Sequence, residues 1–140
     1  MTYNFIGGAI LAGQEKGRDS VVVAASTAHD VNDPKYLTNI RNFEEGEAPE
    51  FDTMTRTVRP TAIGNWELIL VYKPYTLTDT LLMPNCLWNT ISMGLLGDHF
   101  PFIARKEGMV DISDPENWNV VAKPDPSGAY YAIINGKHRN

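Results

Sequence analysis

The sequence predicts a fold that is mainly β or α+β, with six or so short, largely antiparallel strands in a sandwich or open barrel and two short helices. Its 140 residues are the size of one domain, so residues 1–140 are expected to form a single unit. Short β-branched and apolar runs recur along the chain, and turn-forming Gly, Pro, Asn and Asp residues separate them. Only two segments carry apolar residues at helical spacing, so strands dominate the prediction.

The first expected strands surround a polar turn near the N-terminus. Residues 3–12 and 20–25 are apolar runs on either side of a segment bracketed by Gly13 and Gly17, a pattern that predicts a β-hairpin. Because neither run alternates apolar with polar residues, we expect both strands to be buried on both faces. Further strands are expected over residues 65–72, 76–83, 100–104 and 129–134.

Two short helices are expected between these strands. The first begins at Asp33, an N-cap acid that is followed by Pro34 at the first helical position, and apolar residues recur at helical spacing over 36–43. The second covers residues 86–96, with Asn85 as its N-cap.

Residues 44–60 are predicted to form an extended acidic and Thr-rich loop or arm within the domain. Pro49 and Pro60 interrupt any regular pattern there, and the alternating Thr and Arg residues near its end also fit an edge strand. A structureless stretch of this length is unusual inside a compact domain and is often a binding arm. The acids of this expected interaction arm are Glu44, Glu45, Glu47, Glu50 and Asp52.

The charge and cysteine content exclude several classes of protein. Seventeen acids against 12 bases give a net charge of −5, so no nucleic-acid partner is expected from bulk charge. The single cysteine, Cys86, excludes an intrachain disulfide and any cysteine-based metal site. Its apolar surroundings predict a buried, unreactive thiol. Without a membrane-spanning run or a signal-peptide pattern, a reducing cytoplasmic location and no membrane partner are expected.

No metal site, catalytic constellation or cofactor is predicted. The segment Asp30-Val31-Asn32-Asp33 resembles the start of an acidic calcium loop. However, Lys35 and Arg41 stand at the sixth and twelfth places, where such a loop needs Gly and Glu. We therefore expect Asp30 and Asn32 to form Asx turns.

One constellation suggests a small anionic ligand of the nucleotide kind. Arg56 and Arg59 lie close in sequence to Trp66, and Arg105 adds charge from elsewhere in the chain. Arginine forks beside aromatic rings bind nucleotides. The alternative is that the two neighbouring arginines pair with the acidic segment 44–52, within one subunit or between subunits.

Three hypotheses for function follow. The first is a non-enzymatic structural or assembly subunit that self-associates or decorates a larger particle, of which viral particles are an example by analogy of build; its partners are other copies or other protein subunits. The second is a small-molecule module that binds or sequesters a nucleotide-like anion. The third is a small hydrolase that uses His29 or His99 with a neighbouring acid.

Overall fold

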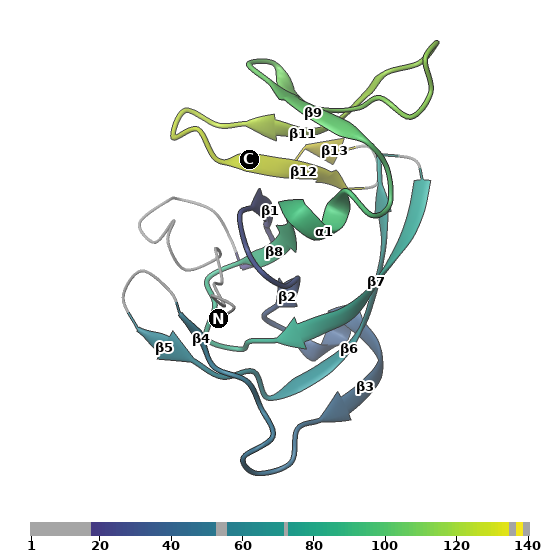
Figure 1. Cartoon of the computed structure of the whole chain (residues 1–140). Coiled ribbons are helices and arrows are strands. Elements are labelled where there is room, and N and C mark those ends of the chain that lie inside the picture. The colour runs from purple at the N-terminus through teal and green to yellow at the C-terminus, as the bar shows by residue number, and fades with distance from the viewer. Residues whose placement is uncertain (1–17, 53–55, 72, 135–136, 139–140) are drawn as a thin grey trace.

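The chain is described here by a computed structural model that covers residues 18–52, 56–71, 73–134 and 137–138 (Figure 1). Strands dominate this part of the chain, which confirms the mainly-β prediction. Eleven strands form one strongly curved sheet, and two more form a separate ribbon. Among the described residues, no helix is long and apolar enough to span a membrane.

Six strands of the large sheet close into a barrel. The barrel closes because the end of the last strand returns to the first, with Ile134 opposite Leu70 and the Val71 N–H donating to the Ile133 carbonyl at 2.8 Å. Most neighbours are antiparallel, but two pairs, β1–β8 and β2–β7, are parallel. In order around the barrel, the strands are β6 (Ala62–Leu70), β7 (Lys73–Leu82), β2 (Asp30–Val31), β8 (Asn89–Ser92), β1 (Val21–Ala24) and β12 (Tyr130–Ile134). A closed barrel thus replaces the expected sandwich or open barrel.

The remaining strands lie outside the barrel. On one side, β3 (Leu37–Asn42) pairs with β6 and ends the sheet. On the other side, the sheet continues from β12 through β11 (Asn119–Pro124) and β10 (Gly108–Asp111) to β9 (Phe102–Arg105). Figure 1 shows β3 and β9 at opposite ends of the molecule. The small strands are β13 (Lys137–His138), which pairs with β12, and the ribbon of β4 (Phe51–Asp52) and β5 (Thr57–Val58).

Alternation along the strands builds the core. In β6, Trp66, Leu68 and Leu70 point inward while the residues between them are exposed. A second, smaller cluster anchors the ribbon, because Phe51 packs against Leu81 there. The ribbon lies within the segment that the sequence suggested as an arm. The largest fully buried apolar side chains are Trp88, Tyr131, Leu77, Ile91, Leu96 and Met109.

The first predicted helix is wrong beyond its opening turn. Asp33 does cap that turn, with its Oδ1 accepting from the Lys35 N–H at 2.9 Å, but the turn is a 3-10 helix limited to Pro34–Tyr36. The chain then becomes β3, which pairs with β6. Asn39 has a φ of 51° and lies where the register of the strand shifts. Because of this irregularity, the spacing of apolar residues along the strand resembles that of a helix.

The second predicted helix is also wrong. Its β-branched residues, Thr90 and Ile91, lie in β8 and are fully buried between β1 and β2. Only one helical turn remains, α1 (Met93–Leu96), and its cap is Ser92 rather than Asn85. The sheet position of β8 decides this outcome, because β-branched side chains pack well on a pleated surface.

The predicted N-terminal hairpin is tested only in part. Residues 3–12 lie outside the described residues. The second strand forms as β1, and Val21, Val22 and Val23 are all buried, as expected for a strand covered on both faces. Its described neighbours are β8 and β12.

Substitution of one buried and one exposed isoleucine tests the packing of the barrel core. Ile91→Ala removes a side chain that is 0 % exposed, so we expect a loss of about 2–5 kcal/mol in the free energy of unfolding, measured in urea. Ile40→Ala makes the same change at a side chain that is 43 % exposed and should cost less than about 1 kcal/mol. Equal losses in the two variants would contradict the placement of β8 inside the barrel.

Candidate functional site

The edge of β9 is the first candidate site. This strand pairs with β10 alone among the described strands, from Phe102 opposite Asp111 to Arg105 opposite Gly108. The turn between β9 and β10 holds two residues, so Arg105 and Gly108, which flank it, exchange main-chain hydrogen bonds. Ile103, two residues earlier in β9, is bonded to β10 in the same way. The Ile112 N–H donates to the Pro101 carbonyl at 3.0 Å, which fits this alternation. The main-chain groups of Phe102 and Ala104 therefore point away from β10, toward the open edge.

An apolar hollow lies beside this edge. It has a volume of about 830 Å³, and Gly94 of α1 and Gly97, the residue that caps α1, are among its lining residues. The Ser92 hydroxyl holds its wall together by donating to the Ser26 carbonyl at 2.6 Å. The hollow is lined by Ala25, Ser26, Thr27, Met93, Gly94, Gly97 and Phe102.

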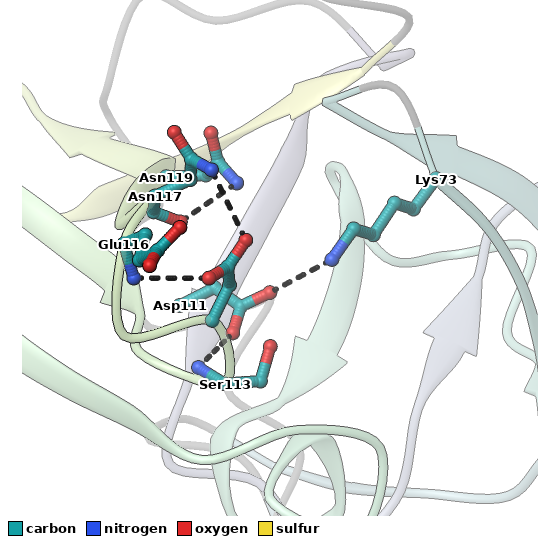
Figure 2. Close-up of polar contacts among 7 residues, drawn as sticks. Lys73, Asp111, Ser113, Glu116, Asn117 and Asn119 are labelled. Carbon is teal, nitrogen blue, oxygen red and sulfur yellow. Dashed lines mark hydrogen bonds and ion pairs between the residues drawn. The ribbon is translucent and has the colours of Figure 1, made fainter.

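The loop that follows β10 presents a tryptophan next to the same strand. Figure 2 shows the polar contacts that shape this loop. Asp111 is buried, its Oδ1 accepts from the Ser113 N–H at 2.8 Å, and the Lys73 Nζ lies 3.8 Å from its Oδ2. Asp114 accepts from the Glu116 N–H at 2.9 Å and from the Asn117 side-chain amide at 3.2 Å, and these bonds lower the pKa of Asp114.

This braced loop leaves Trp118 51 % exposed, the most exposed large apolar side chain among the described residues. The Arg105 guanidinium lies 5.6 Å from the centre of the Trp118 ring, within the range of a cation–π contact. Arg105, one of the four predicted ligand-binding residues, thus stacks on an aromatic ring beside β9 and does not line a pocket with the other three.

Arg56 and Arg59 form a second candidate site. Both line one pocket of about 280 Å³, in which Cys86 also takes part. The Arg59 guanidinium donates to the Ala48 carbonyl at 2.7 Å and pairs with Glu50. That pair follows the alternative given by the sequence, in which arginines meet the acidic segment.

The other acids of the predicted arm are exposed. Glu47 accepts from the Glu44 N–H at 2.9 Å and pairs with Arg41 at 3.1 Å, and both interactions lower the pKa of Glu47. Asp52 accepts from the Thr57 hydroxyl at 3.1 Å. Glu47 and Asp52 therefore contact groups that are close to them in the sequence.

Trp66 lies elsewhere. It is buried in the main core, with its ring 6.4 Å from that of Tyr36, and its edge reaches a different pocket of about 510 Å³ beside Tyr75. Because β6 alternates inward and outward positions, Trp66 shares the inward face with Leu68. This two-residue spacing is visible in the sequence and indicates a core position, although Trp66 was predicted there as a ligand-binding residue.

A buried carboxyl group, that of Asp30, was not predicted from the sequence. Asp30 was expected in an Asx turn, but it lies in β2 and is 0 % exposed. Neither of its carboxyl oxygens has a hydrogen-bond partner among the described residues. Burial raises its pKa to about 8, although the nearby Cys86 thiol and Thr90 hydroxyl lower it to a lesser degree.

The neighbours of Asp30 are buried as well. Asn32, the other residue expected in an Asx turn, donates from its side-chain amide to the Arg18 carbonyl at 2.7 Å. Cys86 is 4 % exposed, which confirms its predicted burial, and burial followed by Asp30 raises the pKa of its thiol to about 12.

The two histidines of the hydrolase hypothesis differ in setting. His29 is buried, and its Nδ1 accepts from the Ser92 N–H at 2.9 Å. Burial, and then the charge of His99, lower the pKa of His29 to about 4. His99 is exposed and packs edge-on against Tyr75 at 5.7 Å. A histidine–acid mechanism stays a prediction.

Comparison with known proteins adds no identification. No known protein family matches the chain, and neither a curated protein nor a solved structure shows significant similarity to it. The function is therefore inferred from the two sites themselves.

The buried pair His29 and Asp30 predicts a pH dependence of stability. The folded state keeps Asp30 protonated up to about pH 8, whereas the unfolded chain releases that proton near its model value of 3.8. This difference lowers stability as the pH rises between these values. His29 acts in the opposite direction between about pH 4 and 6.5, because only the unfolded chain binds its proton there.

The two effects cancel between about pH 4 and 6.5, so we expect stability to fall by about 1.4 kcal/mol per pH unit between pH 6.5 and 8. Urea unfolding at several pH values measures this slope. Asp30→Asn keeps the shape without the titration and should flatten the curve above pH 6.5. Parallel curves for the two proteins would refute a carboxyl group that is neutral in the folded state.

Proposed function

We propose that the protein is a non-enzymatic assembly subunit that pairs with a second copy of itself along β9, and that such pairs build or decorate a larger particle. The observation that carries this proposal is the open edge of β9, with outward main-chain groups at Phe102 and Ala104. An unpaired strand edge is a template for pairing with another chain unless the protein blocks it.

The two described ends of the sheet differ in how they are protected. In β3, Asn39 has a positive φ that disturbs the strand, and Arg41 forms an ion pair with Glu47 beside it. Irregularities and charges of this kind discourage edge pairing. In β9, Phe102, Ile103 and Ala104 are uncharged and pair regularly with β10, and the charged residue of the strand, Arg105, stacks on Trp118. The β9 edge is therefore the favoured contact.

A two-fold axis through Ile103 gives a self-consistent pairing. Antiparallel pairing about this axis places Phe102 opposite Ala104 of the second copy, so the residues with outward groups exchange their main-chain hydrogen bonds. Ile103 then meets its own counterpart on one face of the sheet. On the other face, Phe102 and the adjoining hollow lie next to Ala104 of the second copy.

The surroundings of β9 add contact surface that a short strand alone does not supply. A stable interface buries more than about 1,000 Å² in total. Trp118 and Arg105 lie on the Ile103 side of the strand, and these two residue types are enriched among the side chains that dominate binding energy. Asp98 precedes the strand, and Lys106 and Glu107 follow it, so charges of both signs lie near the ends of the paired strands.

Light scattering tests the pairing. The wild-type chain should show a mass of about 31 kDa or a multiple of it, where 31 kDa is twice the 15.6 kDa of one chain. Ile103→Lys places two like charges together at the axis and should reduce the mass to that of one chain, or halve that of a larger assembly. Ile40→Lys, the matched change on β3, should leave the mass unaltered. A wild-type protein that is monomeric at all concentrations, or an Ile40→Lys protein that alone dissociates, would overturn the proposal.

Tryptophan fluorescence gives an independent measurement. Of the three tryptophans, Trp66 and Trp88 are buried and only Trp118 is exposed, so acrylamide quenching reports on Trp118. Quenching should be weaker in the wild-type assembly than in the Ile103→Lys protein, because a second copy covers Trp118. Trp118→Phe should abolish this difference. Equal quenching of the wild-type and Ile103→Lys proteins would place Trp118 outside the interface.

A further inference from the structure

The turn from Pro84 to Cys86 gathers positive charge in an otherwise acidic protein. Arg18 donates through its Nη1 to the Cys86 carbonyl at 3.3 Å, and through its Nη2 to the Pro84 carbonyl at 3.2 Å and the Asn32 carbonyl at 3.1 Å. These acceptors are main-chain dipoles, so they hold the guanidinium in place without neutralising its charge.

Two further arginines approach the same turn from the ribbon. Arg56 and Arg59 flank the short strand β5, and both are exposed. The positive charges of Arg56 and Arg18 both act to lower the pKa of the Cys86 thiol, so the two guanidinium groups converge on Cys86. The pocket of about 280 Å³ between ribbon and turn is lined by Arg56, Thr57, Val58, Arg59, Thr61, Met83, Pro84, Asn85 and Cys86.

The Arg59 guanidinium already forms an ion pair with a carboxylate of the chain itself. Glu50 pairs with Arg59, and the side chains of the two residues are 57 % and 54 % exposed. Ion pairs this exposed contribute little to stability, because water solvates both partners when they separate. Asp52 accepts a hydrogen bond from Thr57, which lines the pocket, and Asp30 acts on the Cys86 thiol from the barrel side. Glu50 is therefore an anion that a better ligand can displace.

We propose that this pocket binds a small phosphate-type oxyanion, which displaces the Glu50 carboxylate from Arg59 and also contacts Arg56. Arginine forks match the tetrahedral oxygens of such an anion in charge and in geometry. The Thr61 hydroxyl and the Asn85 side chain, which also line the pocket, offer further donors.

Pocket size and lining narrow the class of ligand. Pockets for drug-sized ligands measure about 300–1,000 Å³, so 280 Å³ suits a phosphate group with a small organic part. Trp66 lies in the core and not in this pocket, and none of the described residues that line it is an aromatic residue that could stack on a nucleobase. The ligand is thus smaller than the nucleotide-like anion that the sequence suggested. The Cys86 thiol at this pocket is buried, which makes it a poor nucleophile.

This site goes beyond the proposed assembly function and shares no lining residue with β9. Titration calorimetry with inorganic phosphate, against chloride at equal ionic strength, tests it. The wild-type chain should bind one phosphate with saturation. Arg56→Gln and Arg59→Gln should each weaken binding by ~10-fold or more, the loss expected for one charge-assisted contact. Arg41→Gln is the matched control, because Arg41 forms a similar exposed pair with Glu47 outside the pocket.

A variant of the competing acid tests the exchange directly. Glu50→Gln removes the internal competitor and should tighten phosphate binding several-fold, whereas Glu47→Gln should leave it unchanged. Arg56→Lys keeps the charge without the fork and should bind phosphate less tightly than wild type but more tightly than Arg56→Gln. Near-ultraviolet circular dichroism verifies that each variant keeps the native fold.

The outcomes separate this inference from the assembly proposal. Wild-type protein without saturable phosphate binding, or Arg41→Gln that weakens binding as much as Arg59→Gln, would overturn the site. Equal affinities in the Glu50→Gln and Glu47→Gln proteins would overturn the exchange with Glu50. Ile103→Lys, which is designed to dissociate the assembly, should bind phosphate with wild-type affinity, so failure of one proposal leaves the other standing.

Discussion

A buried amide holds together one end of the barrel. Asn89 is fully buried, and its Oδ1 accepts from the Asn32 N–H at 2.9 Å while its Nδ2 donates to the carbonyls of Arg18 and Ser20 at 3.2 and 3.3 Å. These contacts join the start of β1, the end of β2 and the start of β8. Parallel strands have no hairpin to fix their register, so a satisfied side-chain network of this kind takes over that role.

Both candidate sites depend on this arrangement. Toward the N-terminal side of β8, it positions Arg18, which braces the turn that forms the floor of the arginine pocket. Toward the C-terminal side, β8 ends at Ser92, which caps α1 and bonds to Ser26, and these contacts shape the hollow beside β9. A change at Asn89 would leave buried polar groups unpaired and disturb both sites together.

The sequence predicted those parts of the fold that depend on local pattern. The two long strands β6 and β7 have extended apolar alternation, and both form close to their expected ranges. The two helices were wrong because apolar residues at spacings of three and four also occur in a strand with an irregularity, as in β3. Burial between two other strands, which decides the state of Ile91, is a tertiary effect that no local window contains.

In the candidate sites too, the sequence predicted the features that depend on neighbouring residues and not those that depend on tertiary structure. Arg56 and Arg59 are three residues apart and reach one pocket, so their proximity could be read from the sequence. Arg18 joins them only through the barrel topology, and nothing near it in the sequence marks that contact. Asp30 is the clearest case, because a two-residue strand gives no periodicity and its sequence neighbours are typical of turns. Its burial follows entirely from the position of β2 between β7 and β8.

The net charge of the protein and the individual charges beside the pocket affect an approaching anion differently. The chain carries −5 overall, which would repel an anion at long range, but interactions between exposed charges are largely screened beyond about 8–10 Å at physiological ionic strength. Within that distance, Arg59 pairs with Glu50. The acidic segment therefore acts on the pocket through individual carboxylates and not through the total charge, and an anion reaches Arg59 only in exchange for Glu50. The same screening applies at β9, where the contacts of Ile103 and Trp118 decide the pairing.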